Sequence, residues 1–447
     1  MATDSRRTWL ATASWMSALG LTVCLSLPLA AQELEEASLS MAALDQRALE
    51  LHPEVRAAGL RADEAAISAD VEEGRWPEPR VEYMAEISTP WASHMTTSHM
   101  VTLMQTLPWA ATRKAQAAPA LARERGARAE ERAAAHGALR DLRVELVNIA
   151  RTTEMIRLLE EEQALVSDVL QVLETTLATT EREHSDLYRL RLAEENLVDQ
   201  RREQEGLLAG SRGRLAQLLG QAPEDISLEN VASILTWSPE LPSREQLRAM
   251  IEEGAPALAI FEAQASAARA QEELSERQLR PPPQVMLGYA NMPPMFAHDA
   301  PRHDAIRVGF SIALPVWGGR YSAEARRWQA AAQAAGESQA QRLRELLSRM
   351  ESARARVEQA DARLDAFEAE LVPLAEALSE QVLIGVETGE RSVTDYLGAV
   401  REERTLHTRR LGLQAERATQ LLELQYLSGG LFAVRSPWAY PPAMRGQ

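Results

Sequence analysis

The chain has 447 residues, of which 45% are hydrophobic, 25% charged and 5% aromatic, and its formal net charge is -17. This composition is too polar for a bundle of membrane-spanning helices, and its acidity argues against a nucleic-acid partner, because phosphate binding needs a basic surface. The bias toward alanine, leucine, glutamate and arginine instead predicts long helices with coiled-coil packing.

The first 31 residues have the layout of a secretory signal peptide. Two arginines precede an apolar run from Trp9 to Leu29, which two alanines and an acidic stretch follow. We expect the mature chain to begin near Gln32. Lipid attachment at Cys24, the only cysteine, and a twin-arginine signal at residues 5–10 stay open as alternatives. Each of these interpretations predicts export.

The mature chain repeats its motifs at an offset of roughly 200 residues, which is too long for a small solenoid unit. We expect a first structural repeat at 32–242, a second at 243–430 and a C-terminal tail at 431–447. Each repeat opens with a helical segment that contains a proline, Pro53 or Pro256, and reaches a proline cluster before two segments of alternating polarity. The matched order indicates a duplication.

The alternating segments predict two β-strands in each repeat, at about 80–107 and about 283–314. The pattern is clearest from Ile306 to Leu314, where every second residue is apolar. Each segment has about ten residues, the length that a tilted strand needs to cross a bilayer. A small soluble hairpin would show the same alternation and stays open as an alternative.

A long helical hairpin is expected after each strand pair, at about 111–219 and about 321–428. Along the first helix of each hairpin, apolar residues are spaced by three and four, as in a coiled-coil seam. In the second repeat this seam begins at Leu343 and passes through Leu371 to Leu374. Each repeat therefore predicts the order helix, strand, strand, long helix, turn, helix.

This order resembles the TolC-type outer-membrane factors, the exit ducts of tripartite efflux and type I secretion systems. The resemblance spans nearly the whole mature chain, and it rests on residues 43–57, the strand exit Leu314–Arg320, Pro373 and the segment Gly389–Leu397. It implies a mainly α-helical homotrimer with a small membrane β part in the outer membrane of a Gram-negative cell. Four strands from each chain would form a twelve-stranded β-barrel, continued by an α-helical tunnel in the periplasm.

The sequence supports oligomerisation independently, because two hairpins cannot close a barrel and a sheet in lipid cannot leave its edges unpaired. The resemblance further implies outer-membrane lipid, a periplasmic adaptor protein and an inner-membrane pump, expected to be of the RND type, as partners. No cofactor and no enzymatic activity are expected, since the sequence has no glycine-rich phosphate loop, nucleophile elbow or His-Glu-x-x-His motif.

In the resembled family, charged residues at the helical turns hold the tunnel shut. Arg391 and Asp395 match the family's tip arginine and first tip aspartate, whereas Gly398 stands in place of the second aspartate. Solvated turn and cap charges are the alternative interpretation of these residues. The expected tip and gate residues are Gly389, Arg391, Asp395, Glu387, Glu390, Glu183 and Asp186.

Histidine and methionine gather in the two strand hairpins. Imidazole and thioether groups bind copper, silver and zinc, so the sequence predicts heavy-metal efflux and resembles the CusC and CzcC branch. Outward-facing loops tolerate many residues, and a multidrug or protein-secretion duct of the same family stays an alternative, as does a periplasmic coiled-coil scaffold without a pore. The candidate metal ligands are His94, Met95, His99, Met100, Met292, Met295, His298 and His303.

Overall fold

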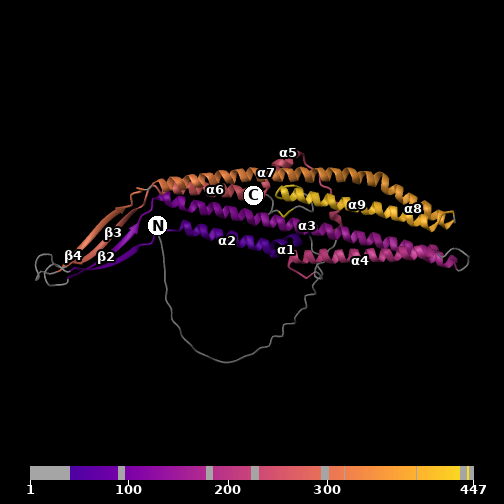
Figure 1. The fold of residues 1–447 in the computed structure, drawn as a ribbon, viewed down its shortest axis with the longest axis horizontal. Helices are drawn as coiled ribbons and strands as arrows, with labels where there is room; N and C mark the ends of the chain where they lie inside the picture. Colours follow the sequence, from indigo (N-terminus) through magenta and orange to yellow (C-terminus); the bar gives the residue numbers. More distant parts are fainter. Residues whose placement is uncertain are drawn as a thin grey trace, which may run out of the picture. The chain divides into compact units, whose positions relative to one another are not determined.

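The computed structural model describes residues 41–88, 96–177, 185–222, 231–292, 302–316, 318–388, 390–432 and 440–441. All of them belong to one compact unit, Ser38–Gln447. This described part consists of long helices and a four-stranded antiparallel sheet (Figure 1). None of its helices has an apolar stretch long enough to cross a membrane.

Two sets of elements follow the predicted order of helix, strand pair and helical hairpin, which confirms the fold class. The first set is α1 (Met41–Leu51), α2 (Pro53–Glu73), β1 (Arg80–Ser88), β2 (Thr96–Thr106), α3 (Ala110–Leu177) and α4 (Ser185–Leu219). The second set is α5 (Arg244–Gly254), α6 (Pro256–Arg277), β3 (Pro283–Met292), β4 (His303–Ile312), α7 (Gly319–Ala366), α8 (Val372–Glu387) and α9 (Val393–Leu427).

The opening helix of each set is broken at the same place. His52 and Ala255 have extended backbones, with ψ of 123° and 111°, and each precedes the proline that starts the next helix. A proline disfavours the α conformation of the residue before it, while its own fixed φ suits the first helical position. The break falls at the matching place in both sets. Pro53 and Pro256 therefore explain why the two sets share this local structure.

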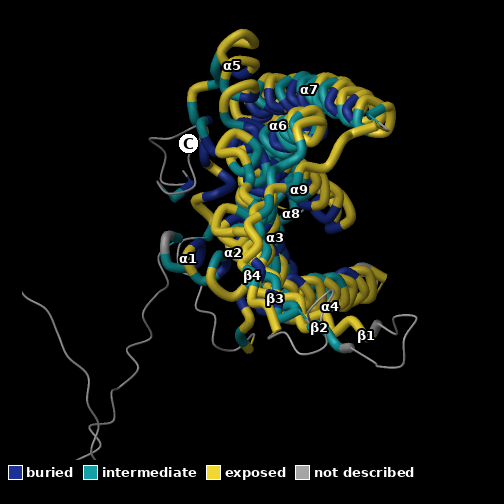
Figure 2. The backbone as a smooth tube through the Cα atoms, turned by 90° about the vertical axis from the view of Figure 1, so that its left-hand side faces the viewer, coloured by how far each residue is buried: buried dark blue, intermediate teal, exposed yellow. Residues whose placement is uncertain are grey.

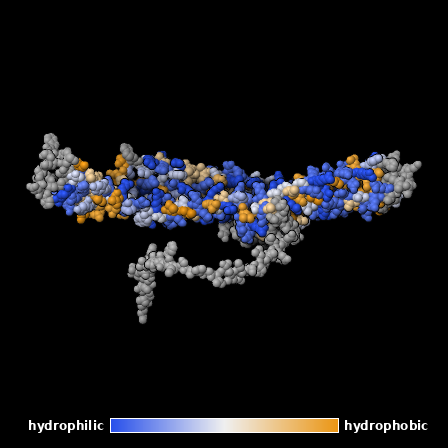
Figure 3. All heavy atoms as spheres, turned by 90° about the horizontal axis from the view of Figure 1, so that it is seen from below, coloured by the Kyte–Doolittle hydropathy of each residue, from blue (hydrophilic) through white to orange (hydrophobic). Residues whose placement is uncertain are grey.

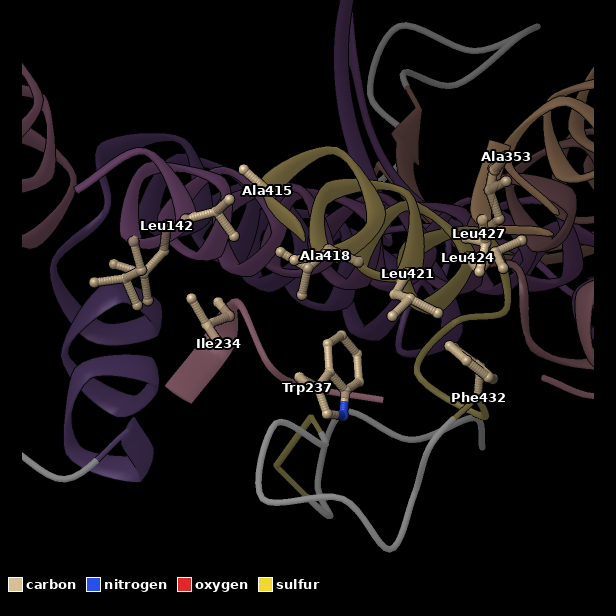
Figure 4. Packing of buried hydrophobic residues seen from close by; sticks show 14 of the residues in the cluster. Leu142, Ile234, Trp237, Ala353, Ala415, Ala418, Leu421, Leu424, Leu427 and Phe432 are labelled. Carbon is tan, nitrogen blue, oxygen red and sulfur yellow. The ribbon is translucent and has the colours of Figure 1, made fainter. Parts of the chain in front are cut away.

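The helices of the two sets pack against one another. Helix α3 contacts α2, α4, α6 and α9, and α7 contacts α6 and α9, so that α6 lies between the long helices of both sets (Figures 1 and 2). The largest hydrophobic core lies where α1, α3, α4, α5, α7 and α9 meet the 3-10 turn Val231–Ile234. There Ile234 and Trp237 face Leu142 of α3 and Leu421 of α9 (Figure 4).

A π-helical turn, Phe367–Leu371, separates α7 from α8. A π turn holds one residue more than an α turn, so the buried stripe moves by one position along the sequence. Val372 and Ala375 are each 6% exposed, whereas Leu374 is 69% exposed. The predicted seam through Leu371 and Leu374 is therefore wrong, because the turn rotates both residues out of the interface.

Candidate functional site

The sheet is the first candidate site, and its strands lie in the order β1-β2-β3-β4 with antiparallel neighbours throughout. The register places Val81, Leu103, Leu287 and Val308 in one row across all four strands. Because side chains alternate between faces along a strand, this row defines one face of the sheet, which we call the apolar face.

The apolar face is exposed in the single chain. Ile306 is 77% and Val308 is 82% exposed, and Figure 2 shows that the strands are mainly exposed or half-buried. Hydrophobic residues accordingly reach the surface of the strand region in Figure 3. The large exposed side chains of this face are Val81, Tyr83, Ile87, Val101, Leu103, Val285, Leu287, Tyr289, Ile306, Val308, Phe310 and Ile312.

The opposite face, which we call the polar face, carries different chemistry. One of its rows joins Glu82, Thr102, Gly288 and Arg307, one residue from each strand. The sheet is therefore two-sided, with an aliphatic and aromatic surface on one side and charged side chains on the other. Among the described residues, β1 and β4 each have one neighbouring strand, so both edges of the sheet are open.

The structure divides the candidate metal ligands between the two faces. His99 lies on the apolar face, where its Nδ1 is hydrogen-bonded to the Tyr83 hydroxyl at 2.8 Å and its ring stacks on the tyrosine. Met100, Met292 and His303 lie on the polar face, where Met292 pairs directly with His303. The four described candidates thus do not converge on one site.

The guanidinium group of Arg307 contacts the sulfur atoms of two candidate ligands. Arg307 places Nη1 3.3 Å from the Met100 sulfur and Nη2 3.6 Å from the Met292 sulfur. His94, Met95, Met295 and His298 lie outside the described residues. Among the residues that the structure does describe, no group of three or more histidine, cysteine, aspartate or glutamate side chains could hold a metal ion.

The turn between α8 and α9 is the second candidate site, and it ends in a capping box at the start of α9. Ser392 accepts a hydrogen bond from the Asp395 backbone N–H at 3.2 Å, and its own N–H donates to Asp395 Oδ2 at 3.1 Å. These bonds satisfy free backbone donors at the start of α9. Hydrogen bonds from the side chain and backbone of Ser392 lower the pKa of Asp395 below its usual value.

Arg391 is placed by the glycine before the turn. Its backbone N–H donates to the Gly385 carbonyl at 2.9 Å, and that of Glu390 donates to the same oxygen at 2.8 Å. The aliphatic part of the Arg391 side chain lies over Gly385, where any Cβ would be 2.5 Å from the arginine Cγ. Gly385 was not among the predicted gate residues, and it lies in the last turn of α8, six residues before Arg391.

A hydrogen bond joins the ends of the two helical hairpins. Arg189 Nη1 of α4 donates to the Thr394 hydroxyl of α9 at 2.7 Å. A second cluster of buried residues spans the same elements and includes Leu190 and Leu197 of α4 with Val393 and Leu397 of α9. The sequence prediction missed Arg189 and Thr394, because nothing in either local segment indicates that residues so far apart meet.

The remaining predicted gate residues are placed only in part. Gly389 and Glu183 lie outside the described residues, and Glu387 and Asp186 lie at the ends of α8 and α4 without a described side chain. Glu390 is exposed in the turn. The described geometry therefore brings Arg391 and Asp395 to one turn beside Thr394, and their role in a gate stays a prediction.

Comparison with known proteins gives matches at the level of structure. No family model and no curated protein matches the chain. The fold is similar to that of CusC, whose structures concern transmembrane channel formation, with a TM-score of 0.73 at 17% identity over 88% of this chain and 93% of CusC. It is also similar to the outer-membrane channel OprN, with a TM-score of 0.69 at 18% identity over 88% of this chain and 90% of OprN.

A third similar structure is the open state of the MtrE outer-membrane channel of Neisseria gonorrhoeae, with a TM-score of 0.68 at 17% identity over 88% of this chain and 90% of MtrE. Each of these matches covers 88% of this chain, and they do not distinguish CusC from the other channels. At such identities the likeness concerns architecture. The chain has the fold of the TolC-type outer-membrane channels.

Proposed function

We propose that the chain is the exit duct of a tripartite efflux system in the outer membrane of a Gram-negative cell. It works as a homotrimer that conducts substrate passively and performs no chemistry of its own. The observation that carries this proposal is the two-faced sheet: its aliphatic and aromatic face is exposed in the single chain, and its other face carries charged side chains.

The dimensions of the sheet support a membrane location. Its strands have 9 to 11 residues, which is the length of a tilted strand across a bilayer. The apolar face would meet lipid, and the polar face would line water. The open edges of β1 and β4 would be costly in lipid, and three copies arranged in a ring would pair every edge and give a barrel of twelve strands.

The helices support a long passage below the sheet. Helix α3 has 68 residues, which corresponds to about 100 Å at the rise of an α-helix. Exposed charged side chains cover much of its length, including Arg157, Glu160 and Glu161. Such faces suit a wet tunnel in the periplasm better than a closed hydrophobic core.

A gate at the start of α4 and at the turn between α8 and α9 fits the same function. Docking of a periplasmic adaptor there, in complex with an inner-membrane pump of the RND type, would favour the open state by binding it more tightly. Arg391 and Asp395 are the described candidates for the closed state. The hydrogen bond from Arg189 to Thr394 would hold the two hairpins of one chain together in that state.

Heavy-metal ions are the proposed substrate. Thioether and imidazole side chains suit copper, silver and zinc, and Met100, Met292 and His303 share the face that would line the channel. Multidrug and protein-secretion ducts have the same architecture, so the substrate has to be tested directly.

Two measurements test the proposal at its two levels. A trimer that is extracted only by detergent and dissociates on heating supports a membrane duct, whereas release by osmotic shock would indicate a periplasmic scaffold. Growth of a deletion strain, with and without the complementing gene, on graded copper, silver, zinc, cobalt and cadmium tests the substrate. Sensitivity to dyes, detergents and antibiotics alone would contradict the heavy-metal assignment.

A further inference from the structure

The methionines of the sheet all lie on one face. The four strands contain five methionines, Met84, Met100, Met104, Met286 and Met292. The register places every one of them on the polar face and none on the apolar face. This segregation becomes visible only with the register, because the five residues are spread over three strands from two distant parts of the chain.

The segregation is opposite to what packing alone would give. Leucine, isoleucine and valine are the closest aliphatic relatives of methionine, and all of those in the four strands lie on the apolar face. A methionine that served only as an apolar filler would be expected to follow them, since the transfer of apolar surface out of water drives both. In this sheet the thioether side chains instead lie only on the polar face.

The register also brings the thioethers into pairs. Met84 is directly opposite Met100, and Met104 is directly opposite Met286. Directly opposed residues of antiparallel strands have Cβ atoms about 4.5–5.5 Å apart, within reach of a shared ion for two flexible methionine side chains. Met292 is opposite His303 in the same way, which adds an imidazole to the series.

The row that contains Arg307 separates the methionines of the polar face into two groups. The Arg307 guanidinium contacts the Met100 and Met292 sulfurs, so a bound cation is disfavoured at these two atoms while the arginine holds this position. Met104 and Met286 lie one row away on the other side of Arg307. Gly309 has no side chain, and this leaves room for the side chain of Met286. A Cβ at residue 309 would stand 2.7 Å from the Met286 sulfur.

We propose that Met104 and Met286, which are directly opposed, bind soft monovalent cations, Ag(I) and Cu(I), at a paired thioether site inside the channel. Soft thioether sulfur selects Cu(I) among the biological metals, and Ag(I) is its redox-stable analogue. Few ligands per site keep each ion weakly held, which allows it to pass to the next site. The location of this site inside a channel rests on the proposed function.

The test is the amount of Ag(I) that the purified full-length protein binds. Protein in detergent is equilibrated with silver nitrate in chloride-free buffer, and bound silver is measured by mass spectrometry. The variant M104L/M286L removes both thioethers at nearly constant side-chain volume. The matched control M250L/M350L removes two methionines from the helices α5 and α7. The single variants Met104→Leu and Met286→Leu serve if the double strand variant does not form trimers.

The expected result is that the wild type and the helix control bind silver equally, and that the strand variant loses most of the bound silver. Each single variant should lose a part of it. Equal binding by the strand variant and the wild type would overturn the proposal, as would an equal loss in the helix control. An absence of silver binding by the wild type would also overturn it.

A parallel measurement separates this inference from the proposed function. Potassium nitrate conductance in planar bilayers reports the channel without reference to the thioethers. Conductance without thioether-dependent silver binding would leave the duct intact and refute the site. Silver binding by a protein that never conducts would refute the duct, and with it the placement of this site in a lumen.

Discussion

The side chain of Arg391 lies across Gly385, so closely that a Cβ at residue 385 would stand 2.5 Å from the arginine Cγ. The same two residues are joined by the Arg391 N–H, which donates to the Gly385 carbonyl. Glycine at this position therefore lets the arginine fold back over the end of α8. The position of the Arg391 guanidinium at the turn depends on this contact.

Gly385→Ala should open the gate. The added methyl group forces Arg391 away at a cost of about 1–3 kcal/mol, which would change the ratio of closed to open channels by roughly 5-fold to 150-fold. We expect a higher resting conductance in planar bilayers. Gly398→Ala is the matched control, because nothing lies within 4 Å of a Cβ there. An equal conductance in both variants would contradict the role of Gly385.

Arg189→Ala should weaken the link between the two hairpins. It removes the hydrogen bond to Thr394, and a hydrogen bond from a charged group contributes about 1.5–3 kcal/mol, less where it is exposed. The resting conductance should rise several-fold. Arg191→Ala is the control, since Arg191 binds Glu174 within the first hairpin. A similar rise in Arg191→Ala would show that general loss of charge, and not the link, is responsible.

Acid should loosen the start of α9. Ser392 lowers the pKa of Asp395 in the folded protein. The ionised carboxylate therefore stabilises the capping box at pH values above the ordinary pKa of an aspartate. That contribution is lost as the pH falls through the lowered value. We expect the resting conductance to rise below about pH 4, the ordinary range of an aspartate.

Asp395→Ala provides the test of this pH dependence. The variant lacks the carboxylate at every pH, so its conductance should already be raised at neutral pH and should not show the acid step. Glu402→Ala is the control, because this exposed carboxylate lies further along α9 and is not part of the capping box. An acid step that persists in Asp395→Ala would refute the assignment.

Asp45→Ala should destabilise the centre of the helical region. Arg143 is fully buried and donates to Asp45 Oδ2 at 2.6 Å and to Gln425 Oε1 at 2.8 Å, which joins α1, α3 and α9. Removal of one partner from a buried ion pair leaves an uncompensated charge and costs about 3–5 kcal/mol. Thermal unfolding followed by circular dichroism measures the loss.

The control for this prediction is the exposed pair of Arg248 and Glu252 on α5, whose atoms lie 2.8 Å apart. Such surface pairs contribute about 0–1 kcal/mol, so Glu252→Ala should change the unfolding temperature little. Comparable destabilisation by Glu252→Ala and Asp45→Ala would contradict the idea that the buried pair is special.

The elements of the fold could be predicted from sequence because each has a local cause. Alternating polarity identified the strands, and the start of α9 has a local cause in the capping box of Ser392 and Asp395. The π-helical turn could not be predicted in the same way. Leu371 and Val372 are both apolar, as are Leu374 and Ala375, so either phase of the seam fits the sequence, and packing against α9 selects one.

The candidate sites depended more strongly on tertiary structure. The histidine and methionine residues were grouped by their nearness in sequence, which joined His99 with Met100 although adjacent strand residues point to opposite faces. Conversely, Met84 and Met286 were not recognised as part of the set, because the register that aligns them with Met100 and Met104 is not encoded locally.

The conductance of the purified protein in planar bilayers tests the central claim most directly. A trimeric duct closed at its helical turns predicts discrete, long-lived conductance steps of uniform size, small in the wild type and larger in Gly385→Ala. A correctly folded protein that produces no steps in either form would contradict the account.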